Sequence, residues 1–462
     1  MVDFLLIKPV YYDEGGKLDL TTSLERVPPL GLGYVAASCK DFSVKILDME
    51  AKEIKTRDVW EEIKKHAPRI IGITVISSTI EQVKKICEII KKNSKIKVIL
   101  GGPHAILDPE SLIKMSDYVV CGEAEIMIND LLHYLINKRG DLTKIKNLLY
   151  IKNKKLIYTE KNLIKNLDDI PFPKRELWNK QDYFHFFAKK RPYTSVITSR
   201  GCPYQCIYCT PIYNIRRRSV ENVIKEIKKI IYEFNTTDIE FFDETFNLGE
   251  KWVIDFCKRV IEEKIKINWR ARCRPDLVTE ESTKMMKEAG CYMISLGVES
   301  ANDSTLKFFN KGYIIRQVEN AIKIIKKNKM ELHAYFIIGS PTEDKKKTLN
   351  TINFSIKKPF DYVIFSILTP QPGTKLMQTA LRNNWLQDSK IDYNKTKGYC
   401  YPIMDHPNLT REEIMKLHKN ATINFFIRPK RMINILKKIL FNKGIEKERV
   451  IKTIFNYLLS KR

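Results

Sequence analysis

Three cysteines in the middle of the chain have the spacing best suited to metal chemistry. Cys202, Cys206 and Cys209 form a C-x3-C-x2-C pattern within one short loop. Thiolates so close together can bind one face of a metal centre, and a [4Fe–4S] cluster is usually held by four cysteines. A local set of three leaves one iron open to a substrate. Zinc is the alternative occupant, but structural zinc sites are closed by four ligands, often as two C-x2-C pairs, and the sequence has no second pair.

Charged and polar side chains follow the cysteine loop at the ends of predicted strands. A carboxylate at a strand end can bind an amine, another can bind a ribose diol, and an arginine offers a fork for a carboxylate. Each feature alone is weak, because such strand ends are often only solvated. Their order after the three cysteines makes the group specific. Its members are Asp243, Glu244, Arg272, Glu299 and Ser300.

Taken in this order, the cysteine loop and the strand ends resemble those of the radical S-adenosylmethionine (radical SAM) superfamily. The resemblance implies that the three cysteines hold a [4Fe–4S] cluster, and that SAM is cleaved at the open iron to a 5′-deoxyadenosyl radical. It implies that Asp243 and Glu244 bind the SAM amine and that Glu299 and Ser300 lie at the ribose. Tyr208, between two of the cysteines, resembles the aromatic residue that flanks the adenine.

A regular repeat of strand, loop and helix carries these residues. Between about 191 and 400 it predicts a partial (β/α)6 barrel of TIM type. The carboxyl ends of its strands meet on one face, where barrel active sites form. The predicted strands cover residues 195–198, 238–242, 267–272, 292–296, 331–338 and 362–368.

The region from residue 1 to about 140 alternates apolar strands with helical patterns, which predicts an N-terminal Rossmann-like parallel sheet in an α/β chain. Ligands of such sheets bind beyond the carboxyl ends of the strands. The turns there resemble those of the cobalamin-binding domain that precedes many radical SAM domains, although a sheet of this kind can also lack a cofactor. The turn residues predicted to bind cobalamin are Pro29, Gly31, Ser77, Ser78, Gly101, Gly102, His104, Gly122 and Glu123.

These turns also include an expected helix cap, a histidine with two alternative roles and a stretch that lacks the motif of a lower histidine ligand. We expect Ser77–Thr79 to cap a helix. His104 either contacts the cofactor or is a hydrogen-bonded turn residue. Cobalamin proteins with a lower histidine ligand carry D-x-H-x-x-G, whereas this chain has Asp48-Met-Glu50, so no lower histidine is expected.

Two further segments surround the predicted barrel. Residues 141–190 read as a linker that contains a hairpin over 148–158, with its turn at Asn153-Lys154, and a proline-stiffened stretch. Residues 401–462 read as a basic helical segment, with a helix start at Thr410 and amphipathic helices over 432–441 and 450–459. These helices either cap the barrel or lie on an anionic bilayer.

Composition sets the function classes that remain. The chain has 462 residues, 81 Lys and Arg against 55 Asp and Glu, and a net charge of +26, which favours anionic partners unless the lysines are simply solvated. It has no apolar stretch long enough to span a membrane, and ten cysteines without a secretion signal indicate the cytoplasm.

The lead hypothesis is a radical SAM enzyme with cobalamin that methylates, cyclises or rearranges an unactivated carbon of a large apolar or lipid-like small molecule. This substrate class follows from the resemblance to anaerobic magnesium-protoporphyrin cyclases and hopanoid-modifying enzymes. A reducing partner such as ferredoxin or flavodoxin, and peripheral membrane contact, are implied with it. One alternative is an RNA methylthiotransferase, which requires a second cluster on cysteines such as Cys39, Cys87 and Cys121. The other is a non-catalytic zinc protein that binds nucleic acid or a membrane surface.

Overall fold

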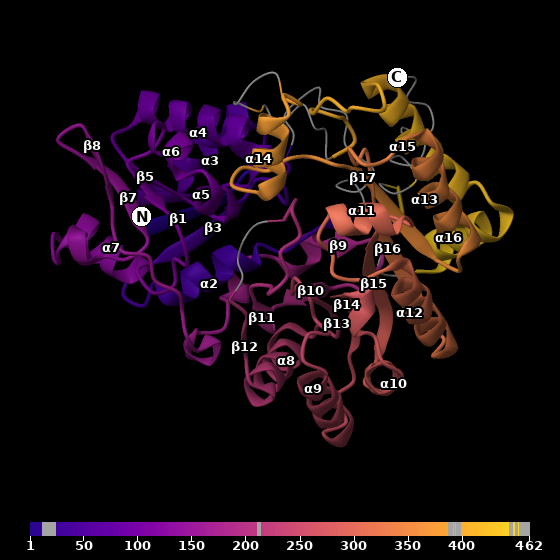
Figure 1. Ribbon diagram of the computed structural model, residues 1–462. Helices are drawn as coiled ribbons and strands as arrows, with labels where there is room; N and C mark the ends of the chain where they lie inside the picture. Colours follow the sequence, from indigo (N-terminus) through magenta and orange to yellow (C-terminus); the bar gives the residue numbers. More distant parts are fainter. Residues whose placement is uncertain are drawn as a thin grey trace. The chain divides into compact units, whose positions relative to one another are not determined.

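The computed structural model describes residues 1–11, 25–209, 214–386, 391, 393, 399–442, 447–448 and 451. The chain divides into two compact units (Figure 1). Unit 1 comprises Met1–Leu18 and Pro28–Asp182, and unit 2 comprises Asp19–Val27 and Tyr183–Arg462.

Unit 1 is built on a seven-stranded sheet in the order β3-β1-β4-β5-β6-β7-β8. The first five strands of this order run parallel, and β7 and β8 continue the sheet antiparallel. The strands are β1 (Val2–Lys8), β3 (Val44–Asp48), β4 (Pro68–Thr74), β5 (Lys97–Gly101), β6 (Tyr118–Val120), β7 (Leu148–Lys152) and β8 (Lys155–Tyr158).

Helices cover both faces of this sheet because its strands are apolar on both sides. In β1, Leu5 and Ile7 face one core while Phe4 and Leu6 face another. Helices α3 to α6 pack on the first face and α2 and α7 on the second (Figure 1). This is the Rossmann-like arrangement that the sequence predicts. The helices are α2 (Leu30–Ser38), α3 (Val59–His66), α4 (Ile80–Asn93), α5 (Pro103–Leu107), α6 (Pro109–Ile113) and α7 (Ile128–Asn137).

The predicted hairpin belongs to this sheet. Asn153 and Lys154, the two turn residues between β7 and β8, both have positive φ (51° and 63°), as a tight two-residue hairpin turn requires. Val120 of β6 pairs with Leu148 of β7, so the hairpin extends the sheet. The sheet therefore runs past the boundary at residue 140 that the sequence indicated, and unit 1 continues to Asp182.

Unit 2 contains six parallel strands that lie side by side in sequence order, as the strand–helix repeat predicts. The strands are β10 (Tyr193–Val196), β13 (Asp238–Phe241), β14 (Asn268–Cys273), β15 (Cys291–Glu299), β16 (Glu331–Ile338) and β17 (Tyr362–Ile367). Two small antiparallel pairs join β2 (Glu25–Arg26) to β9 (Phe184–His185) and β11 (Ser199–Arg200) to β12 (Arg216–Arg217).

Amphipathic helices connect these strands and bury their apolar faces in one core (Figure 1). Ser219 begins the first of them, its hydroxyl accepting a hydrogen bond from the Asn222 amide, as predicted. The connecting helices are α8 (Val220–Phe234), α9 (Glu250–Glu262), α10 (Glu280–Glu288), α11 (Asp303–Phe308), α12 (Ile315–Lys327) and α13 (Lys345–Lys357). Helix α14 (Lys375–Arg382) follows β17 and buries Leu376 and Ala380 in a separate, smaller cluster.

The C-terminal helices pack differently from each other. Helix α15 (Arg411–Phe426) starts at Thr410 in a capping box with Glu413, and its apolar side joins the core of unit 2. Helix α16 (Pro429–Phe441) buries Ile439 but leaves several apolar residues exposed. The helix predicted over 450–459 lies, apart from its second residue, outside the described residues.

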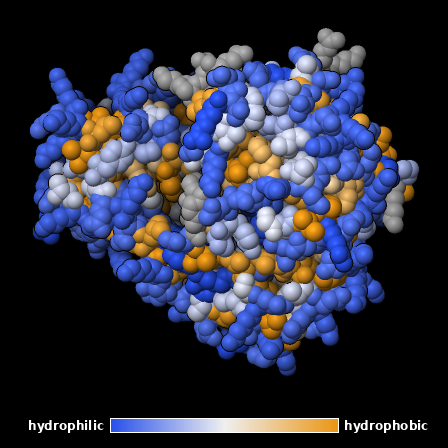
Figure 2. All heavy atoms as spheres, in the orientation of Figure 1, coloured by the Kyte–Doolittle hydropathy of each residue, from blue (hydrophilic) through white to orange (hydrophobic). Residues whose placement is uncertain are grey.

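Figure 2 shows that hydrophilic residues cover most of the visible face of the molecule. Among the helices that the structure describes, none is both long and apolar enough to cross a membrane.

Candidate active site

The cysteine loop begins at the carboxyl end of β10 and is anchored there by Asp243. The Asp243 Oδ1 accepts hydrogen bonds from the Thr198 amide (2.9 Å) and the Ser199 hydroxyl (2.8 Å), and Oδ2 accepts one from the Thr198 hydroxyl (3.1 Å). The Ser199 amide donates to the same Oδ1. Asp243 is fully buried, and burial raises the pKa of its carboxyl. Asp243 therefore holds the start of the loop, and its predicted contact with an amine stays a prediction.

Glu244 differs from its neighbour in the sequence. Its side chain is exposed just beyond the carboxyl end of β13. Desolvation by the surrounding protein raises the pKa of its carboxyl. Of the two adjacent acids predicted to bind an amine, Glu244 is therefore the one that a ligand can reach.

The second half of the cysteine loop rests on the segment Phe309–Lys311. The Ile207 amide donates to the Phe309 carbonyl (3.1 Å), and the Asn310 side-chain amide donates to the Gln205 carbonyl (2.8 Å). The Tyr208 ring packs edge-on against Phe309 with 5.3 Å between ring centroids. The loop is thus fixed at both ends by strand-end and helix-end residues.

The three cysteines of the loop are the thiols that a ligand can reach together. Cys202 and Cys206 are half-buried and Cys209 is exposed. Six of the other cysteines are buried, and burial raises the pKa of each of these thiols: Cys39, Cys87, Cys121, Cys257, Cys273 and Cys291.

In the part of the chain that the structure describes, no three His, Cys, Asp or Glu side chains are grouped as they would be around a single metal ion. The zinc alternative gains no closed ligand set from these residues. Three thiols on one anchored loop could hold a [4Fe–4S] cluster and would leave one iron without a cysteine ligand. The residues present fit this cluster.

Glu299 stands at the end of β15 in an unusual backbone conformation. Its φ is +66°, and the register between β15 and β16 shifts at this point. The Glu299 carboxylate is buried and accepts a hydrogen bond from Lys311 Nζ at 3.0 Å. Lys311 Nζ also donates to the Tyr208 hydroxyl at 3.2 Å. Two predicted SAM residues, Glu299 and Tyr208, therefore meet through a lysine.

Ser300 points away from this group. Its hydroxyl donates to Glu343 Oε1 (2.7 Å) within a buried set of hydroxyl and amide groups that includes Asn302 and Thr351. Burial raises the pKa of the Glu343 carboxyl. The Ser300 side chain thus helps to fix the turn after β15, and its predicted contact with SAM stays a prediction.

Of the three arginines on and after β14, Arg272 keeps the most accessible guanidinium. Its side chain is 37% exposed, stacks 4.3 Å from the Phe242 ring centroid and lies 3.4 Å from a Glu240 oxygen. Arg270 is buried and bonded to Glu240 at 2.6 Å. Arg274 is bonded to Asp276. Arg272 is thus the arginine best placed to receive a carboxylate.

The turns of unit 1 differ in how open their backbone is. A Cβ added to Gly31 would meet nothing within 4 Å, so the backbone at the start of α2, just after Pro29, is open. Ser77, Ser78, Gly101 and Gly102 are half-buried at the ends of β4 and β5. Gly102 has a φ of +99°, which a side chain would strain. The open backbone at Gly31 and the half-buried turns at these strand ends lie where the ligands of such sheets bind.

His104, the second residue of α5, is hydrogen-bonded within unit 1. Its Nδ1 lies 3.0 Å from the Ser77 hydroxyl and its Nε2 lies 3.3 Å from the Ser111 hydroxyl. The ring is buried, and burial lowers its pKa. Ser77 therefore bonds to His104 and not to the helix, and Ser77–Thr79 forms a 3-10 turn ahead of α4 rather than a side-chain cap of that helix.

Gly122 and Glu123 contact the chain on either side of the hairpin, at Asn147 before it and at Ile164 after it. A Cβ on Gly122 would lie 2.8 Å from the side chain of Asn147, which is buried. The Glu123 carboxylate accepts a hydrogen bond from the Ile164 amide at 2.7 Å. Both predicted cobalamin residues thus have structural partners within unit 1.

Charged residues occupy the place of the absent lower histidine. Lys8, at the end of β1, lies 2.9 Å from a Glu50 oxygen and 3.3 Å from an Asp48 oxygen. Although burial alone would lower it, the two carboxylates hold the pKa of Lys8 above its usual value. Glu50 is therefore paired within the protein at the position where other cobalamin proteins carry a histidine.

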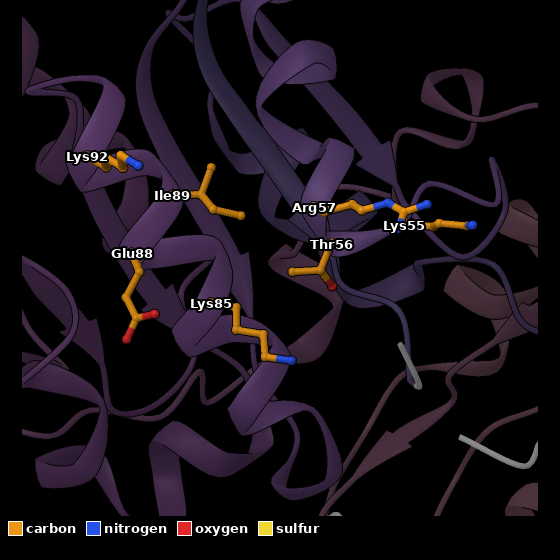
Figure 3. Close-up of a pocket in the computed structure, with 7 residues that line it drawn as sticks. All are labelled: Lys55, Thr56, Arg57, Lys85, Glu88, Ile89 and Lys92. Carbon is orange, nitrogen blue, oxygen red and sulfur yellow. The ribbon is translucent and has the colours of Figure 1, made fainter. Parts of the chain in front are cut away.

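A hollow on unit 1 lies away from these turns (Figure 3). It measures about 460 Å³ between the η1 turn (Thr56–Asp58) and α4, and none of the predicted cobalamin residues lines it. Its lining residues are Lys55, Thr56, Arg57, Lys85, Glu88, Ile89 and Lys92.

Sequence reasoning missed the segment Phe309–Lys311. Its only local signal is a polar Asn310-Lys311-Gly312 turn after a helical pattern, and one lysine does not stand out among 81 Lys and Arg residues. A contact from this segment to residues about 100 positions earlier depends on the packing of the whole unit.

Known families match both units. A B12 binding domain matches residues 16–132, and the Radical SAM superfamily matches residues 196–355. An uncharacterized methyltransferase from Pyrococcus horikoshii is 36% identical over 92% of this chain and 93% of its own length. An anaerobic magnesium-protoporphyrin IX monomethyl ester cyclase from Cereibacter sphaeroides is 25% identical over 87% of this chain and 67% of its own.

Solved structures share the fold. The cobalamin-dependent S-adenosylmethionine radical enzyme OxsB, determined with aqua-cobalamin bound, covers 99% of this chain and 79% of its own. The TM-score is 0.73 at 17% sequence identity.

Proposed function

Because the chain belongs to the radical SAM superfamily, with a B12-binding domain ahead of its radical SAM domain, we propose that it is a methyltransferase acting on an unactivated carbon of a large apolar substrate. Its cofactors are a [4Fe–4S] cluster, SAM and cobalamin. When bound, the cluster and SAM supply a one-electron route to breaking a C–H bond, and cobalamin supplies a carrier for the methyl group.

The chain's own residues bind and orient these groups. Cys202, Cys206 and Cys209 hold the cluster, on a loop whose start is fixed by Asp243. The accessible carboxylate Glu244 takes the SAM amine. The exposure of each group and the donors already bonded to it support these assignments.

The other SAM contacts come from three further side chains. Glu299 accepts hydrogen bonds from the ribose hydroxyls, and Tyr208 flanks the adenine. Arg272 offers its exposed guanidinium to the SAM carboxylate.

In unit 1, open turns receive cobalamin. The backbone at Gly31 and the half-buried turns at Ser77, Ser78, Gly101 and Gly102 contact the corrin. His104, Gly122 and Glu123 hold these turns in place rather than touching the cofactor.

One observation carries the proposal. The cysteine loop is tied at its start to the residue beside Glu244, and at its end, through Lys311, to Glu299. A cluster on the loop and a ligand across these strand ends would therefore share one rigid frame. We further propose that the six parallel strands curve into a partial (β/α)6 barrel whose carboxyl ends form this frame.

Methylation is favoured over cyclisation by the relatives. The P. horikoshii relative is described as a methyltransferase and is the more similar of the two over more of its length. The cyclase relative is named for a magnesium-protoporphyrin ester, which supports a large apolar substrate.

The methylthiotransferase alternative lacks support in unit 1. Cys39 lies in the core on one face of the sheet, whereas Cys87 and Cys121 lie in the core on the other. Burial raises the pKa of Cys39 and Cys87 to about 12 and that of Cys121 to about 11. Buried thiols on opposite faces of a sheet do not form one cluster site.

The central test is anaerobic reconstitution with iron and sulfide, followed by incubation with SAM and dithionite. We expect four irons per chain and release of 5′-deoxyadenosine, with both lost in a Cys206→Ala variant. A protein that binds iron but releases no 5′-deoxyadenosine would contradict radical SAM chemistry. If the absorption band of cobalamin does not shift when cobalamin is titrated with the protein, cobalamin is not a cofactor of this protein.

The substrate is then identified by product analysis. Mass spectrometry of extracts from a deletion strain and its parent should reveal a compound lighter by 14 mass units, the mass of one CH₂, in the deletion strain. A compound in the deletion strain that lacks a ring but does not show this mass difference would favour cyclisation. Replacing dithionite by reduced flavodoxin or ferredoxin tests the proposed protein reductant.

Helix α16 supports peripheral membrane contact in the cytoplasm. Its exposed apolar residues lie on one side of the helix, and the helix carries four Lys and Arg and no acid. The exposed residues are Met432, Ile433, Leu436, Leu440 and Phe441. We expect flotation with vesicles that contain anionic lipid, and loss of flotation in a Leu436→Ser, Leu440→Ser double variant. Tyr232→Ser, at an exposed aromatic residue on α8, is the control.

A further inference from the structure

We propose that Lys311 is a positioning residue that fixes the cysteine loop and the ribose-binding carboxylate relative to each other. This inference rests on the proposed function, because it assigns Glu299 and Tyr208 to SAM. Lys311 Nζ lies 3.0 Å from Glu299 Oε1 and 3.2 Å from the Tyr208 hydroxyl.

The backbone at Lys311 is held in place because the segment Phe309–Lys311 supports the cysteine loop. Its carbonyl accepts a hydrogen bond from Arg274 Nη2 at 2.5 Å, and the Arg274 guanidinium stacks 3.3 Å from the Tyr204 ring centroid. The two preceding residues bond to Gln205 and Ile207. The backbone at Lys311 is therefore tied to the cysteine loop, and its ammonium is held by Tyr208 and Glu299.

A cation is needed at this position because of the way Glu299 is folded. A Cβ on Gly297 would lie 2.7 Å from Glu299 Oε1, so the carboxylate lies back over its own strand. The side chain is buried, and a buried carboxylate is stable only with a close cation or several donors. Lys311, itself only 7% exposed, provides that cation.

The consequence concerns SAM rather than the cluster. Without the ammonium, the Glu299 carboxylate loses its fixed direction and Tyr208 loses its donor. The three cysteines keep their own anchors at Asp243, Phe309 and Asn310. Loss of Lys311 is therefore expected to weaken SAM binding while iron binding persists.

The test compares Lys311→Met, which keeps the length of the side chain but removes its charge, with the reconstituted wild-type protein. We expect four irons per chain in both, and a SAM dissociation constant at least about tenfold higher in the variant. SAM added to the reduced cluster should change its EPR spectrum in the wild type, and the variant should need correspondingly more SAM for the same change. Lys311→Arg should recover part of the affinity.

Lys326→Met is the matched control, because Lys326 pairs with Asp361 at 2.8 Å on the far end of α12. It should leave SAM binding unchanged. Unchanged SAM affinity in Lys311→Met with full iron content would overturn the inference, and so would a loss of iron together with SAM, since that would mean simple support of the loop. A wild-type protein that binds no SAM would instead refute the proposed function.

Discussion

The Asp243 carboxylate lies 2.8 Å from the Ser199 hydroxyl and holds the entrance of the cysteine loop. The same carboxylate accepts hydrogen bonds from the Thr198 amide and hydroxyl, so a strand-end acid of β13 fixes the chain as it leaves β10. Its neighbour Glu244 is left exposed. Two adjacent acids thus have separate tasks, one in building the loop and one available to a ligand.

Replacing Asp243 by Asn should damage the loop. The Asp243 carboxylate accepts hydrogen bonds from two hydroxyls and two backbone amides. In Asn, an NH₂ group replaces one of the two acceptor oxygens and would point at hydrogen-bond donors. We expect the free energy of unfolding to fall by about 1–3 kcal/mol. Reconstituted iron per chain should fall with it, measured by iron assay after gel filtration. Full iron content in a stably folded variant would contradict the anchoring role.

How much of this site the sequence predicts depends on the range of the interactions. The cysteine spacing and the strand ends are local patterns, so the loop, all six strands of unit 2 and the hairpin turn at Asn153-Lys154 could be predicted. The separate roles of Asp243 and Glu244 could not, because which of two adjacent acids turns inward is decided by the donors of β10 and the start of its loop.

The same limit applies to residues that join distant parts of the chain. Lys311 and Tyr208 are 103 positions apart. Ser300 and Glu343 are 43 apart, and their contact takes Ser300 away from the predicted ligand. The sequence pattern of a strand predicts that a polar residue lies at its end. It does not predict which residue of another element will form a hydrogen bond with that polar residue.

Two glycines of unit 1 should respond to alanine in opposite ways. Gly102→Ala forces a Cβ to within 2.7 Å of the Thr74 hydroxyl at a φ of +99°, which should cost about 1–3 kcal/mol of stability. Gly31→Ala meets no atom within 4 Å and lies in α2, so it should stabilise the fold by about 0.5–1 kcal/mol. Denaturant unfolding measures both changes.

Cobalamin titration of the Gly31→Ala variant completes this comparison. If the corrin lies against the open backbone at Gly31, the added methyl group should lower cobalamin affinity while stability rises. Unchanged affinity would exclude this turn from the cobalamin site.

Cobalamin bound to this protein should lack a histidine ligand. Glu50 is paired with Lys8 at the corresponding position, and both ring nitrogens of His104 lie within hydrogen-bond distance of serine hydroxyls. The EPR spectrum of the bound corrinoid in its Co(II) state should therefore show no splitting from a protein imidazole nitrogen. Such splitting, if it disappeared in a His104→Ala variant, would show that the turn rearranges on binding.

Acid should destabilise unit 2 through His333. Burial lowers the pKa of this side chain to about 3, and it packs between Phe187 and Tyr335. In the unfolded chain this histidine has an ordinary pKa of about 6.5 and is protonated below that pH, whereas in the folded state it stays neutral down to about pH 3. The free energy of unfolding therefore falls as the pH drops below about 6.5 and continues to fall towards pH 3. Between pH 6.5 and 5.5 this one group should lower the free energy of unfolding by roughly 1 kcal/mol.

A His333→Phe variant checks that assignment. Its unfolding free energy should fall less steeply over the same pH interval than that of the wild type. The part of the slope that remains is expected from the other histidines whose pKa burial lowers, which include His185, His104 and His406. Equal slopes in the two proteins would rule out His333 as a source of acid sensitivity.

Glu244→Gln separates ligand binding from loop building. The side chain is exposed, so its amide should leave both the free energy of unfolding and the iron content unchanged. If the Glu244 carboxylate pairs with the SAM amine, removal of its charge should raise the SAM dissociation constant about tenfold, measured by equilibrium dialysis on the reconstituted protein. Glu250→Gln, at another exposed acid a few residues later, should bind SAM as the wild type does. SAM affinity that is equal in both variants would assign the amine to another residue.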